Sequence, residues 1–253
     1  MTRRFEDRLV LVTGGAGGLG RALAVGFGRE GAQLVLVDVD EAGLQQTAAE
    51  LEALGAKSST HRVDLADEDA ITAFAAEFCT QHARLDVLVN NAGLAYGEIS
   101  QSFETLSQKK WLRYLAINTV APLLLAQAVR PALAAAQGVI LNQSSMASFV
   151  PATAYGVTKA ALNSMTYGMA HRFAADGIRV NAIAPGLMET PANVAGLTPE
   201  TYGRVQGMQL LNLHGVAQDI VSLYLFLASD EARFINCEVM SCDGGNRMRG
   251  WRY

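Results

Sequence analysis

The sequence predicts an α/β protein, with a doubly wound parallel sheet of about seven strands and helices on both faces. Short apolar runs rich in β-branched residues alternate with longer amphipathic stretches along the chain. Most of the runs are apolar at nearly every position, which is typical of strands buried on both faces of a parallel sheet. The 253 residues contain no repeat, low-complexity tract or linker, so we expect a single domain over residues 1–253.

Each predicted strand is followed by a turn and then by a predicted helix. Gly31, Gly55 and Gly177 lie just beyond three of the predicted helices, where a glycine accommodates a left-handed backbone. We expect strands at residues 9–13, 33–38, 59–63, 85–90, 139–142, 178–183 and 238–241. We expect helices at residues 21–30, 40–54, 67–82, 106–136 and 216–228, and one more that carries Tyr155 and Lys159 and ends near residue 175.

Composition excludes several classes of function. Half of the residues are apolar and the net charge of −4 comes from interspersed acids and bases, so we expect a sizeable core and no nucleic-acid partner. The polar N-terminus and the lack of a long apolar run predict no signal peptide and no membrane partner. The three cysteines form no CxxC pair and the four histidines are scattered, which predicts a reducing, cytoplasmic location and no metal site.

A glycine-rich loop, Gly14-Gly15-Ala16-Gly17-Gly18-Leu19-Gly20, joins the first predicted strand to the first predicted helix. Glycines permit a sharp turn there and let backbone N–H groups and the helix N-terminus approach a pyrophosphate. A flexible turn also collects glycines, so the loop alone is a weak signal. The flanking strand and helix, and the acid Asp38 at the end of the second strand, favour dinucleotide binding in a Rossmann-type fold.

Asp38 also predicts which cofactor binds. Its carboxylate can accept hydrogen bonds from ribose hydroxyls and would repel the 2′-phosphate of NADP. No Arg or Lys lies inside the glycine loop or directly after Asp38 to offset that repulsion. We therefore expect NAD as the cofactor. Capping of the following helix is the other role open to Asp38.

Tyr155 and Lys159 are four residues apart on a predicted helix, so they lie one turn apart on the same face. An ammonium beside a phenol stabilises the phenolate and lowers the pKa of the tyrosine. A phenol tuned in this way can exchange a proton with an alcohol or a carbonyl. In isolation the pair would more often be a surface tyrosine and a solvated lysine, so its context decides.

The motifs together match a known family. The chain resembles the short single-domain branch of the short-chain dehydrogenases/reductases over nearly its full length. The matching motifs are Thr13-Gly14-x-x-x-Gly18-x-Gly20 for the cofactor loop, Asn90-Asn91-Ala92-Gly93, Tyr155-x-x-x-Lys159, Pro185-Gly186 reaching to Thr190, and Asp243-Gly244-Gly245.

The resemblance implies a cofactor-binding half over about residues 1–140 and a catalytic and substrate-binding half over about 141–253. It also implies a homo-oligomer, a tetramer or a dimer. The residues expected to bind the cofactor are Gly14, Gly18, Leu19, Gly20, Asp38, Asp64, Leu65, Asn91, Ala92, Gly93, Tyr155, Lys159, Pro185, Gly186 and Thr190.

The family's catalytic set is implied at four positions. Tyr155 is the implied general acid/base, and Lys159 lowers its pKa and holds the nicotinamide ribose. Asn118 occupies the position of the asparagine that supports a proton-relay water. Ser145 is the implied serine that hydrogen-bonds the substrate oxygen.

The position of the serine departs from the family pattern. Most relatives have it thirteen residues before the tyrosine, where this chain has Asn142, whereas Ser145 is ten before Tyr155. We infer a loop three residues shorter, because deleting loop residues is easier than moving the end of a buried strand. Ser144 and Ser148 are the other candidates.

The substrate is the part that the sequence defines least. The segment of about residues 187–215 is implied to form a lid, and it is rich in apolar and small residues. An apolar or aromatic secondary alcohol or ketone fits this composition, although the same residues can simply pack the lid onto the core. The tail of residues 247–253 is basic and aromatic and suits a subunit contact or a frayed end. The candidate substrate residues are Tyr96, Met146, Phe149, Leu187 and Met188.

The sequence thus favours an NAD-dependent dehydrogenase that interconverts a secondary alcohol and a ketone. An NADPH-dependent carbonyl reductase is the first alternative, and Asp38 and the neutral glycine loop argue against it. A non-catalytic NAD-binding sensor or scaffold is the second, because a fold does not fix a function. The presence of Asn118, Tyr155 and Lys159 argues against that one.

Overall fold

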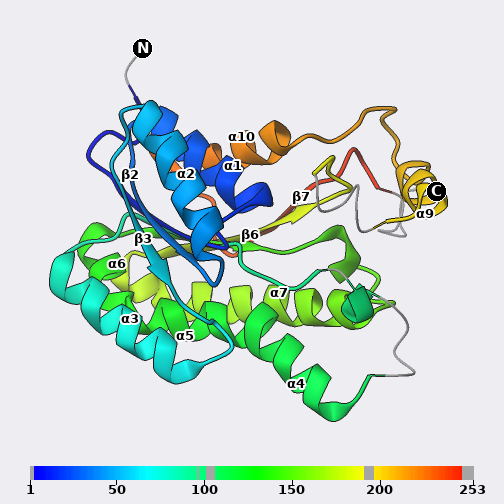
Figure 1. Cartoon of the computed structure of the whole chain (residues 1–253), viewed down its shortest axis with the longest axis horizontal. Helices are drawn as coiled ribbons and strands as arrows, with labels where there is room; N and C mark the ends of the chain where they lie inside the picture. Colours follow the sequence, from blue (N-terminus) through cyan, green and yellow to red (C-terminus); the bar gives the residue numbers. More distant parts are fainter. Residues whose placement is uncertain (1–2, 96, 101–105, 191–196, 247–253) are drawn as a thin grey trace.

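All seven strands lie in one parallel sheet, as the sequence predicts (Figure 1). The computed structural model describes residues 3–95, 97–100, 106–190 and 197–246. The strand order is β3-β2-β1-β4-β5-β6-β7, so the chain winds outward from β1 to β3 and then from β4 to β7. The strands are β1 Leu9–Thr13, β2 Gln33–Asp38, β3 Ser58–Arg62, β4 Val87–Asn90, β5 Val139–Gln143, β6 Arg179–Pro185 and β7 Val239–Cys242.

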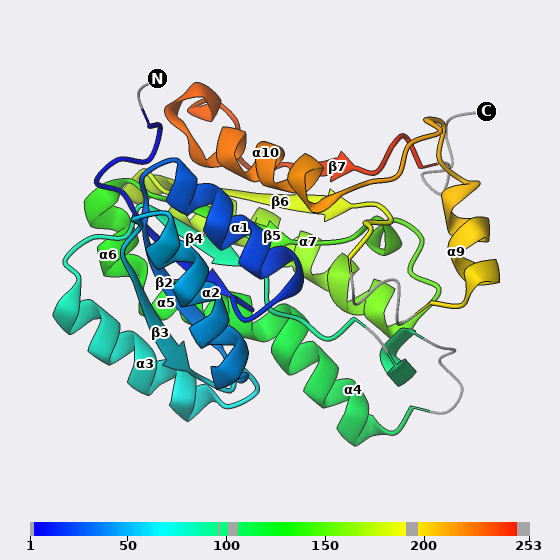
Figure 2. The ribbon, with the colours of Figure 1, turned by 45° about the horizontal axis from the view of Figure 1, so that its top comes forward.

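Helices cover both faces of the sheet (Figures 1 and 2). One face carries α1 Gly18–Arg29, α2 Glu41–Ala53 and α10 Ala217–Ala228. The other carries α3 Glu68–Gln81, α4 Gln108–Leu115, α5 Ala121–Ala128, α6 Arg130–Ala136 and α7 Ala154–Phe173. Another helix, α9 Pro199–Gln206, lies outside these two layers in the segment between β6 and α10.

The alternation of side chains along each strand builds two separate cores. In β1, Val10 and Val12 pack with α1 and α10, whereas Leu9 and Leu11 pack on the opposite face with α3 and α5. β1, β4 and β5 are buried at every position, since both of their faces are covered. The edge strand β3 has the polar sequence Ser-Ser-Thr-His-Arg and is only partly buried.

Two helices differ from their predicted bounds. α1 begins at Gly18, three residues earlier than predicted, because the end of the glycine loop is already helical. The predicted helix at 106–136 is divided into α4, a π-helical segment, α5 and α6. The break before α6 coincides with Pro131, which has no N–H to continue the hydrogen bonds of α5. Across the described residues no single helix is long and apolar enough to span a membrane, and only the bent pair 108–128 and 130–136 passes that test, by length and composition.

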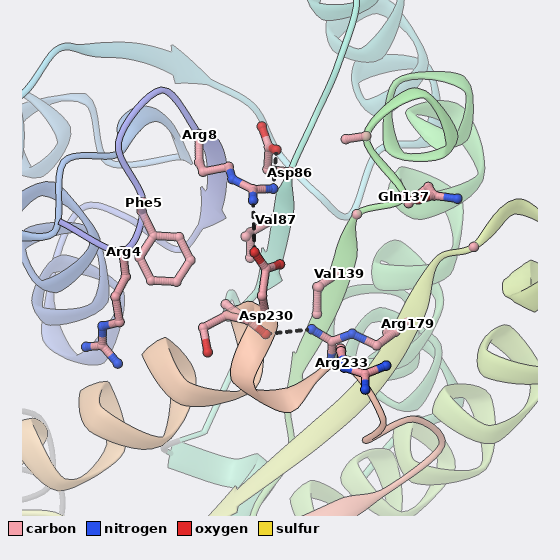
Figure 3. A pocket seen from close by; sticks show the side chains of 15 residues that line it. Arg4, Phe5, Arg8, Asp86, Val87, Gln137, Val139, Arg179, Asp230 and Arg233 are labelled. Atoms are coloured by element: carbon pink, nitrogen blue, oxygen red, sulfur yellow. Dashed lines mark hydrogen bonds and ion pairs between the residues drawn. The ribbon is translucent and has the colours of Figure 1, made fainter. Parts of the chain in front are cut away.

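A charged cluster joins the amino ends of the strands around a cavity of about 250 Å³ (Figure 3). Arg8 donates to Asp86 at 3.1 Å and to Asp230 at 3.3 Å. Arg179 donates to the carbonyls of Leu227 and Ser229 at the end of α10. The arginines and aspartates thus fasten the starts of β1, β4 and β6 to the end of α10, at the edge opposite the carboxyl ends of the strands.

Candidate active site

The carboxyl ends of β1 and β4 lie side by side at the point where the winding of the sheet reverses. A crevice at such a point is the usual ligand site of a doubly wound sheet. The Asn91 side chain donates to the carbonyls of Thr13 at 3.0 Å and Gly14 at 3.3 Å. The N–H groups of Asn91 and Ala92 donate to the Thr13 hydroxyl. These bonds fix the turn after β4 against the start of the glycine loop.

The glycine loop has a shape that only glycine permits at two positions. Gly14 has φ +70°, a left-handed conformation that side chains rarely adopt. A Cβ at Gly20 would lie 1.9 Å from the Gly14 carbonyl oxygen, so no larger residue fits there. The N-cap of α1, Gly17, has no side chain to satisfy the first N–H groups of the helix. The loop therefore fits a pyrophosphate group.

Asp38 faces the glycine loop and does not cap α2. One of its oxygens accepts from the Ala16 N–H at 3.1 Å, and the other accepts from Val39 at 2.7 Å and Asp40 at 3.1 Å. Asp40 is the residue that caps α2, through the N–H of the third residue of the helix. A carboxylate has about four acceptor sites, so Asp38 retains capacity for a ribose hydroxyl.

Two arginines lie near this site that the sequence pattern did not reveal. Arg21 on α1 reaches back to the Ala16 carbonyl at 2.7 Å, and its other donors bond to side chains and a carbonyl of α2. Arg62 pairs with Asp38 across the β2–β3 register, is exposed, and donates through Nε to the Val39 carbonyl. Arg21 is thus used within the protein, whereas Arg62 retains unused donors in the described structure.

The remaining predicted cofactor residues follow β3 and β4 at the same edge. Asp64 is exposed and Leu65 is partly buried just beyond β3. The turn after β4 passes directly over the catalytic candidates, because a Cβ at Gly93 would lie 3.2 Å from Asn118 Oδ1 and 3.3 Å from Lys159 Nζ. The glycine thus permits close approach of this turn to both residues.

Tyr155 and Lys159 lie on the first turns of α7, which Thr153 caps through the Gly156 N–H. Tyr155 is partly exposed, whereas Lys159 is 2% exposed. Lys159 Nζ lies 5.8 Å from the centroid of the Tyr155 ring and donates to the Gln143 carbonyl at 2.7 Å. Burial lowers the pKa of Lys159 to about 8. The amine is therefore mostly charged at neutral pH and lies beside the phenol.

Asn118 is buried in a π-helical segment, Ala116–Val120. Its Oδ1 accepts from the Leu94 N–H at 2.8 Å, and its Nδ2 donates to the Leu94 carbonyl at 2.9 Å and the Thr158 hydroxyl at 3.0 Å. The amide therefore ties the turn after β4 to α7. Isolated π-helical turns are frequent at functional sites.

The three candidate serines differ in exposure and in hydrogen bonding. Ser144 is buried and donates to Asn163 Oδ1 at 2.6 Å. Ser148 is buried and donates to the Ser145 carbonyl at 2.7 Å. Ser145 is partly exposed, and its Oγ accepts from the Ala147 N–H at 3.2 Å. Of these three serines, only Ser145 has a hydroxyl proton with no acceptor among the described residues.

The Pro185-Gly186 and Asp243-Gly244-Gly245 motifs meet at the ends of β6 and β7. The Gly186 N–H donates to the Cys242 carbonyl at 2.8 Å, and a Cβ at Gly186 would lie 2.6 Å from the Asp243 Cα. Thr190 is 7% exposed, and its N–H donates to the Met188 carbonyl. The segment after β6 is therefore held closely beside the C-terminal motif.

The predicted substrate residues fall into two groups. Met146 is partly exposed and Phe149 is 37% exposed, both in the short connection between β5 and α7. Leu187 and Met188 are buried, and Met188 belongs to the core on the α10 side of the sheet. Tyr96, residues 191–196 of the predicted lid, and the tail 247–253 lie outside the described residues.

A polar cluster holds the two ends of the lid segment together. His214 Nδ1 lies 2.5 Å from Glu189 Oε1, and His214 Nε2 lies 2.9 Å from the Gln206 amide. Tyr202 donates to Glu189 at 3.3 Å. This cluster could not be predicted from the sequence, because its members are up to 25 residues apart and form no motif.

Comparison with known proteins identifies the family. A family model described as "Enoyl-(Acyl carrier protein) reductase" matches residues 14–247. The chain is 34% identical over 249 residues to cis-4-hydroxycyclohexanecarboxylate dehydrogenase of Sinomonas cyclohexanicum, covering 97% of this chain and 98% of that protein. The chain belongs to the short-chain dehydrogenase/reductase family. Oxidoreduction is the general activity of this family, and the motifs described above are those of its members.

Two solved structures are similar over nearly their whole length. A 7α-hydroxysteroid dehydrogenase in complex with NADH and 7-oxo glycochenodeoxycholic acid has a TM-score of 0.89 and 28% identity, and the match covers 97% of this chain and 96% of that one. L-Sorbose reductase from Gluconobacter frateurii in complex with NADPH and L-sorbose has a TM-score of 0.87 and 27% identity, and the match covers 99% of both chains. Family members of this fold thus bind either nicotinamide cofactor.

Proposed function

We propose that this protein is an NAD-dependent oxidoreductase that interconverts a secondary alcohol and a ketone by hydride transfer. The observation that carries the proposal is the buried Lys159 ammonium beside the partly exposed Tyr155 ring, next to a turn after β4 that is also bonded to the start of the glycine loop. Tyr155 is the general acid/base, because it is a partly exposed titratable group with a cation next to it. When bound, NAD supplies the hydride acceptor in the oxidative direction.

In alcohol oxidation, Tyr155 takes the hydroxyl proton of the substrate as the carbinol hydrogen leaves as hydride. The positive charge of Lys159 favours the phenolate and so brings the pKa of the tyrosine nearer to neutral pH. In ketone reduction, Tyr155 returns the proton to the developing alkoxide. Lys159 also binds the nicotinamide ribose in this proposal.

Ser145 is the donor to the substrate oxygen, because its hydroxyl proton is available and its side chain is partly exposed. Asn118 has another task. Its amide is already committed to Leu94 and Thr158, so it supports the site by holding the turn at Gly93 against α7. A proton relay that includes Asn118 therefore uses its main chain or a water near it.

NAD is favoured over NADP by Asp38, whose carboxylate faces the glycine loop and would repel a 2′-phosphate. Arg62 favours the alternative, an NADPH-dependent carbonyl reductase, because its exposed guanidinium lies beside Val39 and retains unused donors among the described residues. Among the described residues, Asp38 is bonded to the glycine loop through the Ala16 N–H, whereas Arg62 is bonded to Val39. The balance therefore favours NAD.

The substrate is proposed to be an apolar or aromatic secondary alcohol, and a cyclic one fits best. The support is the apolar Met146 and Phe149 beside Ser145, together with a relative and a similar structure whose names specify cyclic alcohols. We propose that residues 187–215 act as the lid of one catalytic domain. The protein would act in the cytoplasm as a homo-oligomer, a tetramer or a dimer.

A non-catalytic NAD-binding sensor is the competing proposal from a different class. It requires no alignment of acid/base and donor groups. In this chain Ser145, Tyr155 and Lys159 lie within one connection and the helix that follows it, and Lys159 is held buried despite the cost of desolvating a charge. A sensor would use Lys159 only to bind the nicotinamide ribose, and it gains nothing from a phenol and a hydroxyl donor placed beside that lysine.

The test is turnover with a panel of secondary alcohols, from small aliphatic to cyclic, aryl and steroidal ones, followed by the absorbance of reduced nicotinamide with NAD and with NADP. We expect NAD-dependent turnover with at least one cyclic alcohol. Tyr155→Phe should keep NAD binding and lower kcat by about 10²- to 10⁴-fold, because it removes the proton-transfer group.

Tyr167→Phe is the matched control, because Tyr167 lies on the same helix and is 46% exposed. It should leave kcat unchanged. Equal kcat values for Tyr155→Phe and the unmodified enzyme would refute the assignment of Tyr155. Tight NAD binding with no turnover on the whole panel would favour the sensor.

A further inference from the structure

Gln143, the last residue of β5, connects the two faces of the sheet. Leu141 belongs to the core on the α10 side, and the Asn142 amide donates to the Thr166 hydroxyl of α7 on the opposite side. Side chains alternate along a strand, so the Gln143 side chain lies on the α10 side. Its carbonyl instead accepts from Lys159 of α7. One residue is therefore bonded both to α7 and, through its side chain, to α10. These two helices lie on opposite sides of the sheet (Figure 1).

Tyr224 of α10 is the partner of the Gln143 side chain. The tyrosine is wholly buried in the apolar core on its face, and its hydroxyl donates to Gln143 Oε1 at 2.6 Å. Burial raises the pKa of Tyr224 far above its ordinary value, so the group stays a neutral donor. An unpaired hydroxyl in such a place costs free energy, so each partner holds the other in place.

Lys159 depends on the same residue for its hydrogen bonding. Within the described residues, the buried ammonium of Lys159 donates its hydrogen bond to the Gln143 carbonyl. The other groups next to it are the Tyr155 ring on its own helix, the Asn118 amide from the π-helical segment and Gly93 from the turn after β4. In this part of the chain no carboxylate forms an ion pair with Lys159, so the carbonyl fixes its position.

We propose that Tyr224 is a positioning residue for the reaction: its hydrogen bond to the Gln143 side chain, together with the bond from the Ser144 N–H to the Ile183 carbonyl at 2.7 Å, fixes the peptide whose carbonyl holds the Lys159 ammonium beside Tyr155. The inference rests on the proposed function, since it assigns to Lys159 the task of activating Tyr155. The residue that the proposal adds to the site, Tyr224, is 69 positions after Tyr155 in the sequence and lies on the other side of the sheet.

The variant Tyr224→Phe removes the hydroxyl and keeps the ring. Gln143 is then left without its side-chain partner, and its peptide is held from one side only, by the bond from the Ser144 N–H to the Ile183 carbonyl. The carbonyl is less precisely directed, so the ammonium of Lys159 is less well stabilised. We expect the pKa of Lys159 to fall by about 0.5 or more. For alcohol oxidation we expect kcat at neutral pH to fall about three- to tenfold and the acid limb of its pH profile to move up, with KM for the alcohol little changed.

Direct titration of Lys159 makes the test independent of turnover. The chain has only four lysines, and Lys57, Lys109 and Lys110 are exposed, so NMR of ¹³C-labelled lysine ε-carbons can follow the buried one. If the unmodified protein oxidises no alcohol, the proposed function fails, and the shift of the Lys159 titration in Tyr224→Phe still decides this inference.

Phe27→Leu is the matched control for lost packing. Phe27 is fully buried in the same core as Tyr224, and its side chain is a hydrocarbon ring that can form no hydrogen bond of the kind Tyr224 makes. It should lower stability, yet leave the Lys159 titration and the pH profile unchanged. An unchanged Lys159 titration in Tyr224→Phe, with no greater loss of kcat than in Phe27→Leu, would overturn the proposal.

Gln143→Leu provides a second route if Tyr224→Phe does not fold well. It removes the side-chain acceptor and should produce the same shift of the Lys159 titration. Combining Gln143→Leu with Tyr224→Phe should lower kcat no further than either change alone, because the pair acts as a unit. Additive losses of kcat would contradict the proposed chain of contacts.

Discussion

Lys159→Met is expected to remove a specific part of the pH dependence of stability. Burial lowers the pKa of Lys159 from 10.5 to about 8, and solvent does not screen the effect because the side chain is almost inaccessible. One pKa unit corresponds to about 1.4 kcal/mol, so holding the charged lysine inside the folded protein costs about 3 kcal/mol below pH 8.

The direction with pH follows from proton binding. Between pH 8 and 10.5 the unfolded chain binds more protons at Lys159 than the folded protein does, so the free energy of unfolding rises with pH in that window. About 2 kcal/mol of the cost should be recovered between pH 8 and pH 10. Methionine has a similar length and no charge, so the variant lacks this rise. The unpaired Gln143 carbonyl in the variant costs about 1–3 kcal/mol, but at every pH.

The measurement is urea unfolding of the unmodified protein and of Lys159→Met at intervals from pH 7 to pH 10. The difference between their free energies of unfolding is plotted against pH. Repeating the comparison in a Tyr155→Phe background removes any titration of the neighbouring phenol. Lys57→Met, at an exposed lysine, is the control and should give a flat difference. A flat difference for Lys159→Met as well would refute the physical account of this lysine as a charge held at a cost.

Two further predictions concern the serine and the cofactor. Ser145→Ala should lower kcat by about 10²-fold. Ser144→Ala should chiefly lower the free energy of unfolding, by about 1–2 kcal/mol, because it loses the bond to Asn163. Steady-state kinetics and urea unfolding of both variants check this, and the reverse pattern would exchange the roles of the two serines. Asp38→Asn should lower kcat/KM with NAD by about tenfold or more and narrow the preference for NAD over NADP. Arg62→Ala should lower any activity with NADP. An unchanged ratio of kcat/KM with NAD to kcat/KM with NADP in Asp38→Asn would contradict the cofactor assignment.

The order and type of the main elements could be predicted because they depend on local patterns. A strand buried on both faces must be apolar at nearly every position, and a turn into a helix beside a ligand collects glycines. Both signals lie within a few consecutive residues, as in Leu9–Thr13 and the loop at Gly14–Gly20.

The features that were missed depend on contacts between distant residues. The π-helical segment around Asn118 leaves no mark on hydrophobic periodicity, because it changes a single turn inside a buried helix. Tyr224 and Gln143 are 81 residues apart and belong to segments that are otherwise apolar. Arg21 has the sequence position of an ordinary helix residue, yet its guanidinium folds back onto the Ala16 carbonyl.

The charged cluster at the amino ends of the strands has a consequence for the order in which the chain completes its fold. Arg8 immediately precedes β1, the third strand across the seven-stranded sheet, and its partners Asp86 and Asp230 are 78 and 222 residues further along. During synthesis β1 emerges before either partner, and Asp230 comes only after α10. The ribosome must therefore deliver 222 further residues before Arg8 acquires its second ionic partner, so a strand near the middle of the sheet is secured late.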